Sequence, residues 1–459
     1  MKDPDTATVV RCVVVNFNGG DLVAACVDSL LAEASPDVAV QVVVVDNASV
    51  DGSADRLVAT HGDRVYLVRN ASNEGYVAAN AGMHAIDGLP DPDHVALVNP
   101  DATLEPGCLA ALVAALDADP GAGAAAPCML FAHRFVDLEV RAPAEPPGGD
   151  PRPLAVQLWG VRTNGVERLG QLPPGRGVGD PEEVGGRRFR WLGPDATVGV
   201  PVPLDAGAPT ATLTVTLTLS SPRPKEVAVG GVHVRVGPQP TTIEVPIDPT
   251  RAIERIANAG SQVFDDGAGA DRGHFAPLGP PYDQPADVFA WCGGGVLLRW
   301  AYLADVGGFE PSLFLYYEDT DLSWRGRARG WHCSYVPTAR VRHVQGASGG
   351  AGSDRFVVAT TRNRLVVAVR NAPWLVVRRA VAATWRELWA SLRHEVLVPL
   401  TRLRRPVTRM ARLRLTGLGS AIVALPAALV ARRRLGRVAT VDRHAVAAGL
   451  VPHPGGDHH

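Results

Sequence analysis

Three carboxylates, Glu318, Asp319 and Asp321, lie within four positions of the segment YYEDTDLSWRGRARGW, which spans 316–331. Acidic residues favour the first turn of a helix and arginines the later turns, so the segment predicts the start of a solvated helix. A carboxylate held beside a substrate can also act as a general base that takes the proton from an attacking hydroxyl. At helical spacing Asp321 falls one turn before Arg325, which favours a structural ion pair for this residue. The choice between these roles depends on the elements that surround the segment.

Polar side chains also stand at the ends of predicted strands. The apolar runs VVRCVVVNFN, VQVVVVDNAS, RVYLVRN and HVALVNPD alternate with helical patterns, which predicts a parallel sheet covered on both faces. Three of these runs end at Asn16, at Asp46 and at the pair Asn99 and Asp101. Because ligands of such sheets bind beyond the carboxyl ends of the strands, we expect these side chains in a ligand crevice. Carboxylates and amides there suit ribose hydroxyls, a base edge and a metal-bound diphosphate.

Composition and motifs exclude several classes of protein. The chain has 459 residues, 46% of them hydrophobic and 20% charged, which predicts a folded protein of about two to four domains. The net charge of −2 gives no electrostatic reason to expect a nucleic-acid partner. Only Lys2 and Lys225 occur, neither of them in a phosphate-binding loop motif, so a P-loop NTPase is excluded. No G-x-G-x-x-G follows the first strand, so an ordinary pyrophosphate-binding turn for NAD or FAD is unsupported. The six cysteines form no C-x-x-C pair, so we expect free thiols in a reducing compartment.

Shifts in composition divide the chain into four predicted parts. The α/β pattern occupies 8–142 and resumes over 251–352. Between them, 143–250 is rich in proline and glycine and then alternates Val, Thr and Leu with polar residues, which predicts an inserted β-sandwich domain. The last part, 353–459, predicts a helical, arginine-rich extension.

The C-terminal extension has two arginine clusters around an apolar segment. Six arginines fall within 402–414 and four within 432–437. The apolar segment TGLGSAIVALPAALVA between them has about 16 residues and is interrupted by Pro426, so we expect it to be too short to span a membrane. We interpret the extension as an anchor on an anionic membrane surface; the alternative is an ordinary packing arm with a solvated basic face. The first ten residues, MKDPDTATVV, show no signal-peptide pattern, so we expect a cytoplasmic protein that is peripheral on the inner face of the membrane.

An ordered set of motifs carries a resemblance to a known family. The segments VVVNFNGGD, VVVVDNASVDGS, NEGYVAANAG, ALVNPDA, GGGVLLRWAYLADVGGFEPSLFLYYEDTDLSWRGRARGW and VRHVQ follow one another along the chain. Together they resemble family 2 glycosyltransferases with the GT-A fold, and the rhamnosyltransferase-like branch in particular. The resemblance implies an α/β, Rossmann-like, mostly parallel sheet, which here is interrupted by the all-β insertion and followed by the helical extension.

The resemblance also implies roles for individual residues. Asp319 corresponds to the catalytic base. A Mg²⁺ or Mn²⁺ ion is expected to bind Asp101 and His343, with Asn99 where many relatives have the first acid of Asp-x-Asp. The nucleotide-sugar contacts implied are Asn16, Asp46, Asn80, Asn99 and Asp101. The acceptor side is expected to comprise Trp291, Gly293, Gly294 and Glu318.

Two of these acceptor-side residues keep an alternative interpretation. Trp291 offers a flat apolar face to a sugar ring, but tryptophan is also a common core residue. Glu318 could orient the acceptor or only occupy the first turn of the helix. The function implied is inverting transfer of a sugar, with rhamnose expected, from a nucleotide-diphosphate sugar to a hydroxyl of a lipid-linked or polysaccharide acceptor in cell-envelope glycan synthesis. The alternatives are a sugar nucleotidyltransferase, although NFNGGD lacks the basic residues of that class, and a non-enzymatic carbohydrate-binding protein that uses the β insertion.

Overall fold

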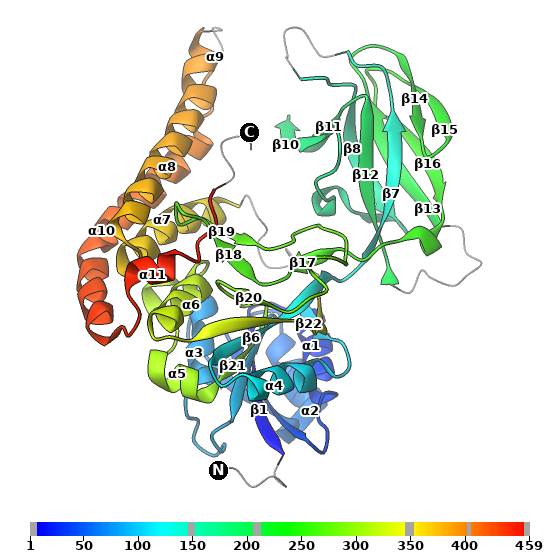
Figure 1. Ribbon diagram of the computed structural model, residues 1–459. Helices are drawn as coiled ribbons and strands as arrows, with labels where there is room; N and C mark the ends of the chain where they lie inside the picture. The colour runs from blue at the N-terminus through cyan, green and yellow to red at the C-terminus, as the bar shows by residue number, and fades with distance from the viewer. Residues whose placement is uncertain (1–6, 146–151, 205–212, 345–352, 402–404, 454–459) are drawn as a thin grey trace. The chain divides into compact units, whose positions relative to one another are not determined.

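The computed structural model describes residues 7–145, 152–204, 213–344, 353–401 and 405–453 (Figure 1). The chain forms two compact units. Unit 1 comprises Met1–Leu130, Ala257–His274 and Gly279–His459, and unit 2 comprises Phe131–Ile256 and Phe275–Leu278. Unit 1 contains the predicted α/β part and also the C-terminal helices.

The first half of unit 1 is the predicted parallel sheet. Strands β1 (Thr8–Asn16), β2 (Val38–Asp46), β3 (Val65–Arg69) and β4 (His94–Val98) lie in the order β3-β2-β1-β4 and pair in parallel. Their valine-rich runs are buried because helices cover the sheet. The chain changes direction of winding between β1 and β4, the kind of position where ligands bind in open α/β sheets.

The second half of the sheet is mixed. Strand β21 (Gly295–Arg299) pairs antiparallel with β4, and the order continues through β6 (Ala122–Phe131) and β22 (His332–His343) to β20 (Ala286–Val288). Short strands β5 (Ala102–Leu104) and β17 (Ile256–Asn258) pair with β22 and β6, respectively, and β18 (Ser261–Val263) pairs with β19 (Gly269–Asp271). The antiparallel pairing of β5 with β22 sets Ala102 opposite His343, so the end of β22 returns to the end of β4.

Helices connect these strands. Their bounds are α1 Leu22–Leu31, α2 Ser53–His61, α4 Cys108–Ala118, α5 Trp300–Val306 and α6 Glu318–Ala328. Between β3 and β4, where the sequence has a helical pattern, the structure has a 3₁₀ turn at Tyr76–Ala79 followed by the single turn α3 (Asn80–Met83). All six cysteines are free thiols, five of them buried, as expected.

Unit 2 is the predicted β-sandwich. One sheet has the order β10-β11-β8-β13-β16 with β9 at its side, and the other has the order β12-β7-β14-β15. The strands are β7 Arg134–Arg141, β8 Val156–Thr163, β9 Val166–Glu167, β10 Val178–Val184, β11 Arg187–Leu192, β12 Asp195–Val202, β13 Leu213–Ser220, β14 Lys225–Val229, β15 Val232–Val236 and β16 Thr241–Ile247. Alternate residues of both sheets, such as Val198 and Leu217, form one apolar core.

The division between the units differs from the predicted boundaries. We assigned 8–142 to the first α/β part, but β7 pairs with β12 along its whole length, from Arg134 opposite Val202 to Arg141 opposite Asp195. Unit 2 therefore begins at Phe131 and ends at Ile256, with a short addition at Phe275–Leu278. The proline- and glycine-rich composition that suggested residue 143 begins only after this first strand of the sandwich.

The described part of the C-terminal extension is helical, as predicted, and belongs to unit 1. Its helices are α7 Asp354–Asn371, α8 Trp374–Leu392, α9 Val398–Thr401, α10 Arg409–Val438 and α11 Arg443–Ala447, with a π-helical turn at Arg393–Leu397. In Figure 1, α7, α8 and α10 lie side by side. Apolar residues of these helices share a buried cluster with Trp324 of α6.

Helix α10 corrects the prediction of a short, interrupted apolar segment. It continues for 30 residues through Pro426. Within the described ranges it is the one helix that is long and apolar enough to cross a membrane by length and composition, and 22% of its most apolar window is buried.

Candidate functional site

The strand ends bring the first predicted pair of residues together. Because β1 and β2 pair in parallel, Asn16 lies opposite Asp46, and the Asn16 Nδ2 donates to Asp46 Oδ1 at 3.0 Å. The same amide donates to the hydroxyls of Ser49 and Ser53 at 3.1 and 2.9 Å. Asn16 is fully buried, so its visible role is to fix the Asp46 carboxylate and the turn into α2.

Asn47 is a site residue that the sequence analysis missed. Its Nδ2 donates to the Gly75 carbonyl at 2.8 Å, and its Oδ1 accepts from Asn70 Nδ2 and from the backbone N–H of Glu74. The side chain is buried and holds the 70–75 loop against the end of β2. In the sequence, only its position directly after Asp46 could have indicated that Asn47 lies near the predicted site.

Asn80 does not join the other predicted nucleotide contacts. Its Nδ2 donates to the Phe309 carbonyl at 3.0 Å, and its Oδ1 accepts from the Phe309 N–H at 2.8 Å. This reciprocal pair satisfies both ends of the amide and ties α3 to the segment after α5. We therefore give Asn80 a structural role and leave it out of the proposed nucleotide contacts.

Asp101 and His343, 242 positions apart, lie in contact. The His343 Nε2 is 3.0 Å from Asp101 Oδ1, and Asn99 Nδ2 is 3.3 Å from the same nitrogen. Both members of the pair are largely buried, with side chains 8% and 12% exposed, respectively. The pairing of β5 with β22 explains the contact, because it brings the last residue of β22 to the loop that follows β4.

This donor set fits a divalent cation. Mg²⁺ and Mn²⁺ sites next to phosphates commonly use one or two protein ligands and keep the remaining positions for phosphate oxygens and water. Nε2 cannot donate to Asp101 and accept from Asn99 at the same time, and a cation shared by Asp101 and His343 removes that conflict. Asp101 and His343 would hold such an ion together, and the ion would supply positive charge beside a bound diphosphate. Among the described residues, no third Asp, Glu, His or Cys completes such a group.

Gly293 and Gly294 connect this pair to Asp319. The backbone N–H of Asn99 donates to the Gly294 carbonyl at 3.2 Å, and the N–H of Gly293 donates to Asp319 Oδ2 at 3.4 Å. A Cβ at Gly293 would lie 2.7 Å from the Tyr76 ring, and one at Gly294 would lie 2.9 Å from Met129 Cε. The rigid Tyr76 ring therefore favours glycine at position 293, whereas the flexible end of Met129 could move aside at position 294.

The pKa of Asp319 suits a general base. Burial raises it to about 6, partly opposed by hydrogen bonds from the backbone N–H groups of Thr320 and Gly293. The negative charge of Asp271, another residue that the sequence analysis missed, raises it further. Asp319 is thus ionised at neutral pH and has gained basicity compared with an ordinary aspartate.

Glu318 differs from Asp319 in its environment. Its side chain is buried, and within the described part of the chain its Oε2 has no hydrogen-bond partner. Burial raises the pKa of Glu318 well above its usual value, and the charge of Asp319 adds to this shift. The two adjacent buried carboxyl groups therefore differ in their environments: the backbone N–H groups of Thr320 and Gly293 donate to Asp319, whereas Glu318 Oε2 has no partner among the described residues.

Asp321 is structural, as its spacing predicted. It is fully buried, and its Oδ2 accepts from Arg325 Nε at 2.8 Å. Burial alone would raise the pKa of Asp321, but the charges of Arg325 and Arg370 outweigh it, so the pKa is lowered.

Trp291 corrects the acceptor-side prediction. Its side chain is 1% exposed, and its ring packs against Phe309 with 6.1 Å between ring centroids. A ring with no open face cannot stack on a sugar, so Trp291 is a core residue. Tyr76, which was not predicted, lies closer to the reactive groups, because its hydroxyl donates to the Gly293 carbonyl.

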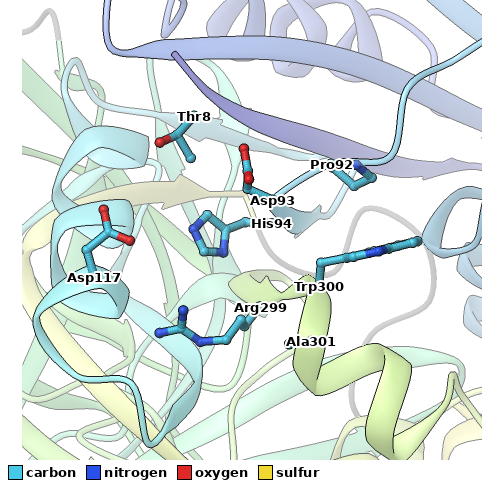
Figure 2. A pocket seen from close by; sticks show the side chains of 8 residues that line it. All are labelled: Thr8, Pro92, Asp93, His94, Asp117, Arg299, Trp300 and Ala301. Carbon is cyan, nitrogen blue, oxygen red and sulfur yellow. The ribbon is translucent and has the colours of Figure 1, made fainter. Parts of the chain in front are cut away.

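A separate pocket of 390 Å³ lies at the amino ends of β1 and β4, opposite the carboxyl ends that carry the predicted site residues (Figure 2). It is lined by residues from the beginnings of β1 and β4, including Thr8 and His94, together with Arg299 and Trp300. None of the predicted site residues lines it. The polar groups at the carboxyl ends of the strands, and not this pocket, are therefore the candidate site.

Comparisons with known proteins identify similarity over the first part of the chain. Residues 12–139 match the model of the family described as glycosyl transferase family 2. A 140-residue stretch is 29% identical to an N-acetylglucosaminyl-diphospho-decaprenol L-rhamnosyltransferase of Mycobacterium tuberculosis and covers 28% of this chain and 45% of that relative. The chain thus spans less than half the length of the curated relatives it matches.

Two solved structures are similar over most of the chain at low identity. One is GalNAc-T7 with UDP, GalNAc and Mn²⁺, with 13% identity, a TM-score of 0.42 and coverage of 92% of this chain and 56% of that one. The other is the mannosyltransferase PcManGT from Pyrobaculum calidifontis with GDP-Man and Mn²⁺, with 14% identity, a TM-score of 0.39 and coverage of 92% and 88%, respectively. The match of residues 12–139 to the family model shows that the chain carries a family 2 glycosyltransferase segment, and the mycobacterial relative agrees with the rhamnosyltransferase-like branch that the motifs predicted.

Proposed function

We propose that this protein is an inverting, metal-dependent glycosyltransferase that moves a sugar from a nucleotide-diphosphate donor to a hydroxyl of a glycan acceptor. One observation carries the proposal. Asp319, with its raised pKa, and the Asp101–His343 pair flank the same two-residue segment, Gly293 and Gly294. Asp319 accepts from the N–H of Gly293, and Asn99, beside the Asp101–His343 pair, donates its N–H to the Gly294 carbonyl, so a general base and a diphosphate-binding pair would be linked through adjacent residues.

The residues divide the reaction between them. Asp319 accepts the proton of the acceptor hydroxyl as its oxygen forms the bond to the anomeric carbon, and the bond to the diphosphate breaks on the opposite face. Burial favours the neutral form of the adjacent Glu318, so Asp319 is the carboxylate that we assign to this role. Asp101 and His343 would hold the cation, with Asn99 beside them, and Mg²⁺ or Mn²⁺ bound there would supply positive charge that stabilises the leaving diphosphate.

On the donor side, we assign the nucleotide to the ends of β1 and β2. Asp46 is held by Asn16, and Arg69 Nη1 lies 3.9 Å from its Oδ2, so the carboxylate is fixed in one orientation. A fixed carboxylate can accept hydrogen bonds from ribose hydroxyls or from a base edge. The expected sugar is rhamnose, which rests on the relative whose name specifies L-rhamnosyl transfer.

For the acceptor, we propose a lipid-linked or polysaccharide glycan of the cell envelope and a position on the inner face of the membrane. The relative's name specifies a diphospho-decaprenol acceptor. The C-terminal helices expose Trp385 and Trp389 on α8 and Ile422 and Val423 on α10, each more than half exposed. Arginines flank this apolar surface, and such a combination suits an anionic bilayer surface.

A thermal-shift panel tests the function. The full chain is heated with dTDP-, UDP- and GDP-sugars, with and without Mn²⁺, and the best ligand is then incubated with lipid-linked acceptors to detect glycoside formation. We expect one donor class to raise Tm, more strongly with Mn²⁺ present, and to be consumed in transfer. Failure of every nucleotide sugar to bind would contradict the proposal, and pyrophosphate release from a nucleoside triphosphate and a sugar phosphate would favour a nucleotidyltransferase instead.

A further inference from the structure

The turn that carries Glu318 and Asp319 has an unfavourable backbone conformation. Phe314, Tyr316 and Tyr317 have φ values of 61°, 68° and 70°. Bulky residues with a side chain at Cβ rarely adopt this left-handed region, so three of them within four positions need support from their surroundings. The turn leads directly into α6, whose first two residues are Glu318 and Asp319.

One side of the turn is held by the 70–77 segment. The backbone N–H groups of Tyr76 and Val77 donate to the Phe314 carbonyl at 2.7 and 3.4 Å. Gly75 permits this approach, because a Cβ there would lie 2.1 Å from the Phe314 oxygen. The 70–77 segment, which follows β3, therefore supports the turn that precedes Asp319.

The other side is held by Asn363 of α7. Its Nδ2 donates to the carbonyls of Leu313, Leu315 and Tyr316 at 2.9, 3.1 and 2.8 Å. Its Oδ1 accepts from Arg362 Nη1 at 2.5 Å, and the side chain is fully buried. Three carbonyls around one amide require a donor at this position, and an aspartate of the same size would present an acceptor to all three.

Helix α7 is itself fixed to α6 two turns further on. Arg370 Nε and Asn371 Nδ2 both donate to Asp321 Oδ1, at 2.9 and 2.8 Å. Asn363 and the pair of Arg370 and Asn371 thus contact the turn and the helix on either side of Asp319. The family-matched segment ends at residue 139, so α7 lies outside it.

We propose that Asn363 is a positioning residue: it holds the 313–317 turn in its left-handed conformation and thereby places the Asp319 carboxylate. This inference rests on the proposed function for its catalytic consequence, but the hold on the turn is independent of any activity. The C-terminal extension then supplies part of the reaction machinery through α7.

Hydrogen exchange on the full chain tests the hold. In Asn363→Ala, amide exchange in peptides covering 313–320 is expected to speed up by about 10-fold or more, since three backbone carbonyls lose their common donor. Thr360→Ala is the matched control, because the Thr360 hydroxyl donates only within its own helix, to Phe356 and Val357. Unchanged exchange at 313–320 in Asn363→Ala, with the rest of the chain also unchanged, would overturn the inference whatever the activity.

Kinetics then test the consequence. Asn363→Ala is expected to lower kcat by about 10²-fold while KM for the donor and nucleotide affinity stay within about 2-fold, because a displaced base slows the chemical step and leaves donor binding intact. Asn363→Asp should be slower still. In an Asp319→Asn background the Asn363 substitution should add little, because the group it positions is gone.

The outcomes separate the two proposals. Equal loss of kcat and donor affinity, in step with a general loss of stability, would contradict a positioning role. If Asn363→Ala does not fold, Asn363→Ser keeps one donor and should give intermediate exchange and kcat. Absence of transfer by the unchanged protein, together with faster exchange in Asn363→Ala, would refute the proposed function and leave the hold on the turn supported.

Discussion

The Arg370 guanidinium binds the Asp321 carboxylate with 2.9 Å between Nε and Oδ1, and the carboxylate has no exposed surface. The pair joins α7 to α6 two residues after Asp319, the proposed base. Arg325 and Asn371 complete the coordination of the same carboxylate, so its charge is well compensated. A compensated buried charge becomes very unfavourable when one partner is removed.

Removing Arg370 should therefore destabilise the protein strongly. Arg370→Met is expected to cost about 3–5 kcal/mol, because it leaves the buried Asp321 charge with one arginine fewer. Urea denaturation, monitored by tryptophan fluorescence, measures the decrease in the free energy of unfolding. Arg379→Met is the matched control, since its pair with Asp265 is at the surface and should contribute less than about 1 kcal/mol. Equal losses for both variants would contradict the importance of the buried pair.

Asp319→Asn should separate binding from chemistry. We expect transfer to fall by about 10²- to 10⁴-fold, since the amide cannot accept the proton, while calorimetric affinity for the nucleotide stays within about 2-fold. Asp305→Asn, at a surface pair with Arg329, is the control and should keep the parent rate. Transfer by Asp319→Asn near the parent rate would remove Asp319 from the role of base.

The same substitution should stabilise the fold above pH 6. The folded-state pKa of Asp319 is raised to about 6, so the native state binds a proton more tightly than the unfolded chain, and stability falls as pH rises from about 4 to about 6. Asparagine has no such charge to bury. Tm at pH 7.5 should rise by roughly 1–3 °C, and the gain should disappear near pH 4. A lower Tm at pH 7.5 would contradict an unfavourably buried carboxylate.

The acidic limb of the pH–rate profile should belong to Asp319. Transfer is expected to increase as pH rises through about 6, because the base must be ionised. Glu318→Gln should keep a limb near the same pH, since the Asp319 carboxyl group, which we propose as the base, is still present. Loss of this limb in Glu318→Gln would move the role of base to Glu318.

Sequence and structure agree where local patterns decide the result. Runs of valine define β1, β2 and β4, and parallel pairing then places Asn16 opposite Asp46 without further information. Contacts between distant segments could not be read from such patterns. Trp291 packs against Phe309, and the Asn80 side chain is hydrogen-bonded to the backbone of the same residue. Nothing in the sequence near Trp291 or Asn80 indicates these contacts.

Helix α10 and Asn363 are two further cases in which contacts between distant segments could not be predicted from local sequence patterns. Pro426 predicts a break in the helix because proline lacks an N–H. The helix nevertheless continues, and its buried residues, such as Ala421 and Ala428, pack in an apolar cluster on either side of the proline. Asn363 lies in an ordinary helical pattern, and only the left-handed turn before α6 gives its amide three acceptors. The motifs indicated the base, and the tertiary structure was needed to find what holds it.

The Asp101–His343 pair should govern the metal dependence of nucleotide binding. Asp101→Ala and His343→Ala are each expected to weaken Mn²⁺-dependent affinity for the nucleotide diphosphate by about 10-fold or more, because each removes one of the two proposed metal ligands. Calorimetry with and without Mn²⁺ measures the difference. Asp119 and His332 form a similar pair, 2.7 Å apart, outside the site, so Asp119→Ala is the matched control and should keep the parent affinity. An Mn²⁺ effect that survives in Asp101→Ala would place the ion elsewhere.

The outer faces of α8 and α10 should mediate binding to anionic membranes. Trp385 and Trp389 are 55% and 59% exposed, and Val423 of α10 is 82% exposed, which is unusual for residues of this size. Replacing both tryptophans with serine and Val423 with aspartate should release the full chain from phosphatidylglycerol vesicles in a sedimentation assay, since apolar insertion and charge attraction act together.

Val184→Asp provides the control for that assay. Val184 is 62% exposed in unit 2, away from the arginine-flanked helices in sequence, so the same change in polarity there should leave pelleting unchanged. Raising the salt concentration should weaken binding of the parent protein, because the arginine contribution is screened while the apolar contribution is not. Undiminished pelleting of the α8 and α10 variant would show that these faces do not contact lipid, and the alternative of a packing arm with a solvated basic face would then stand.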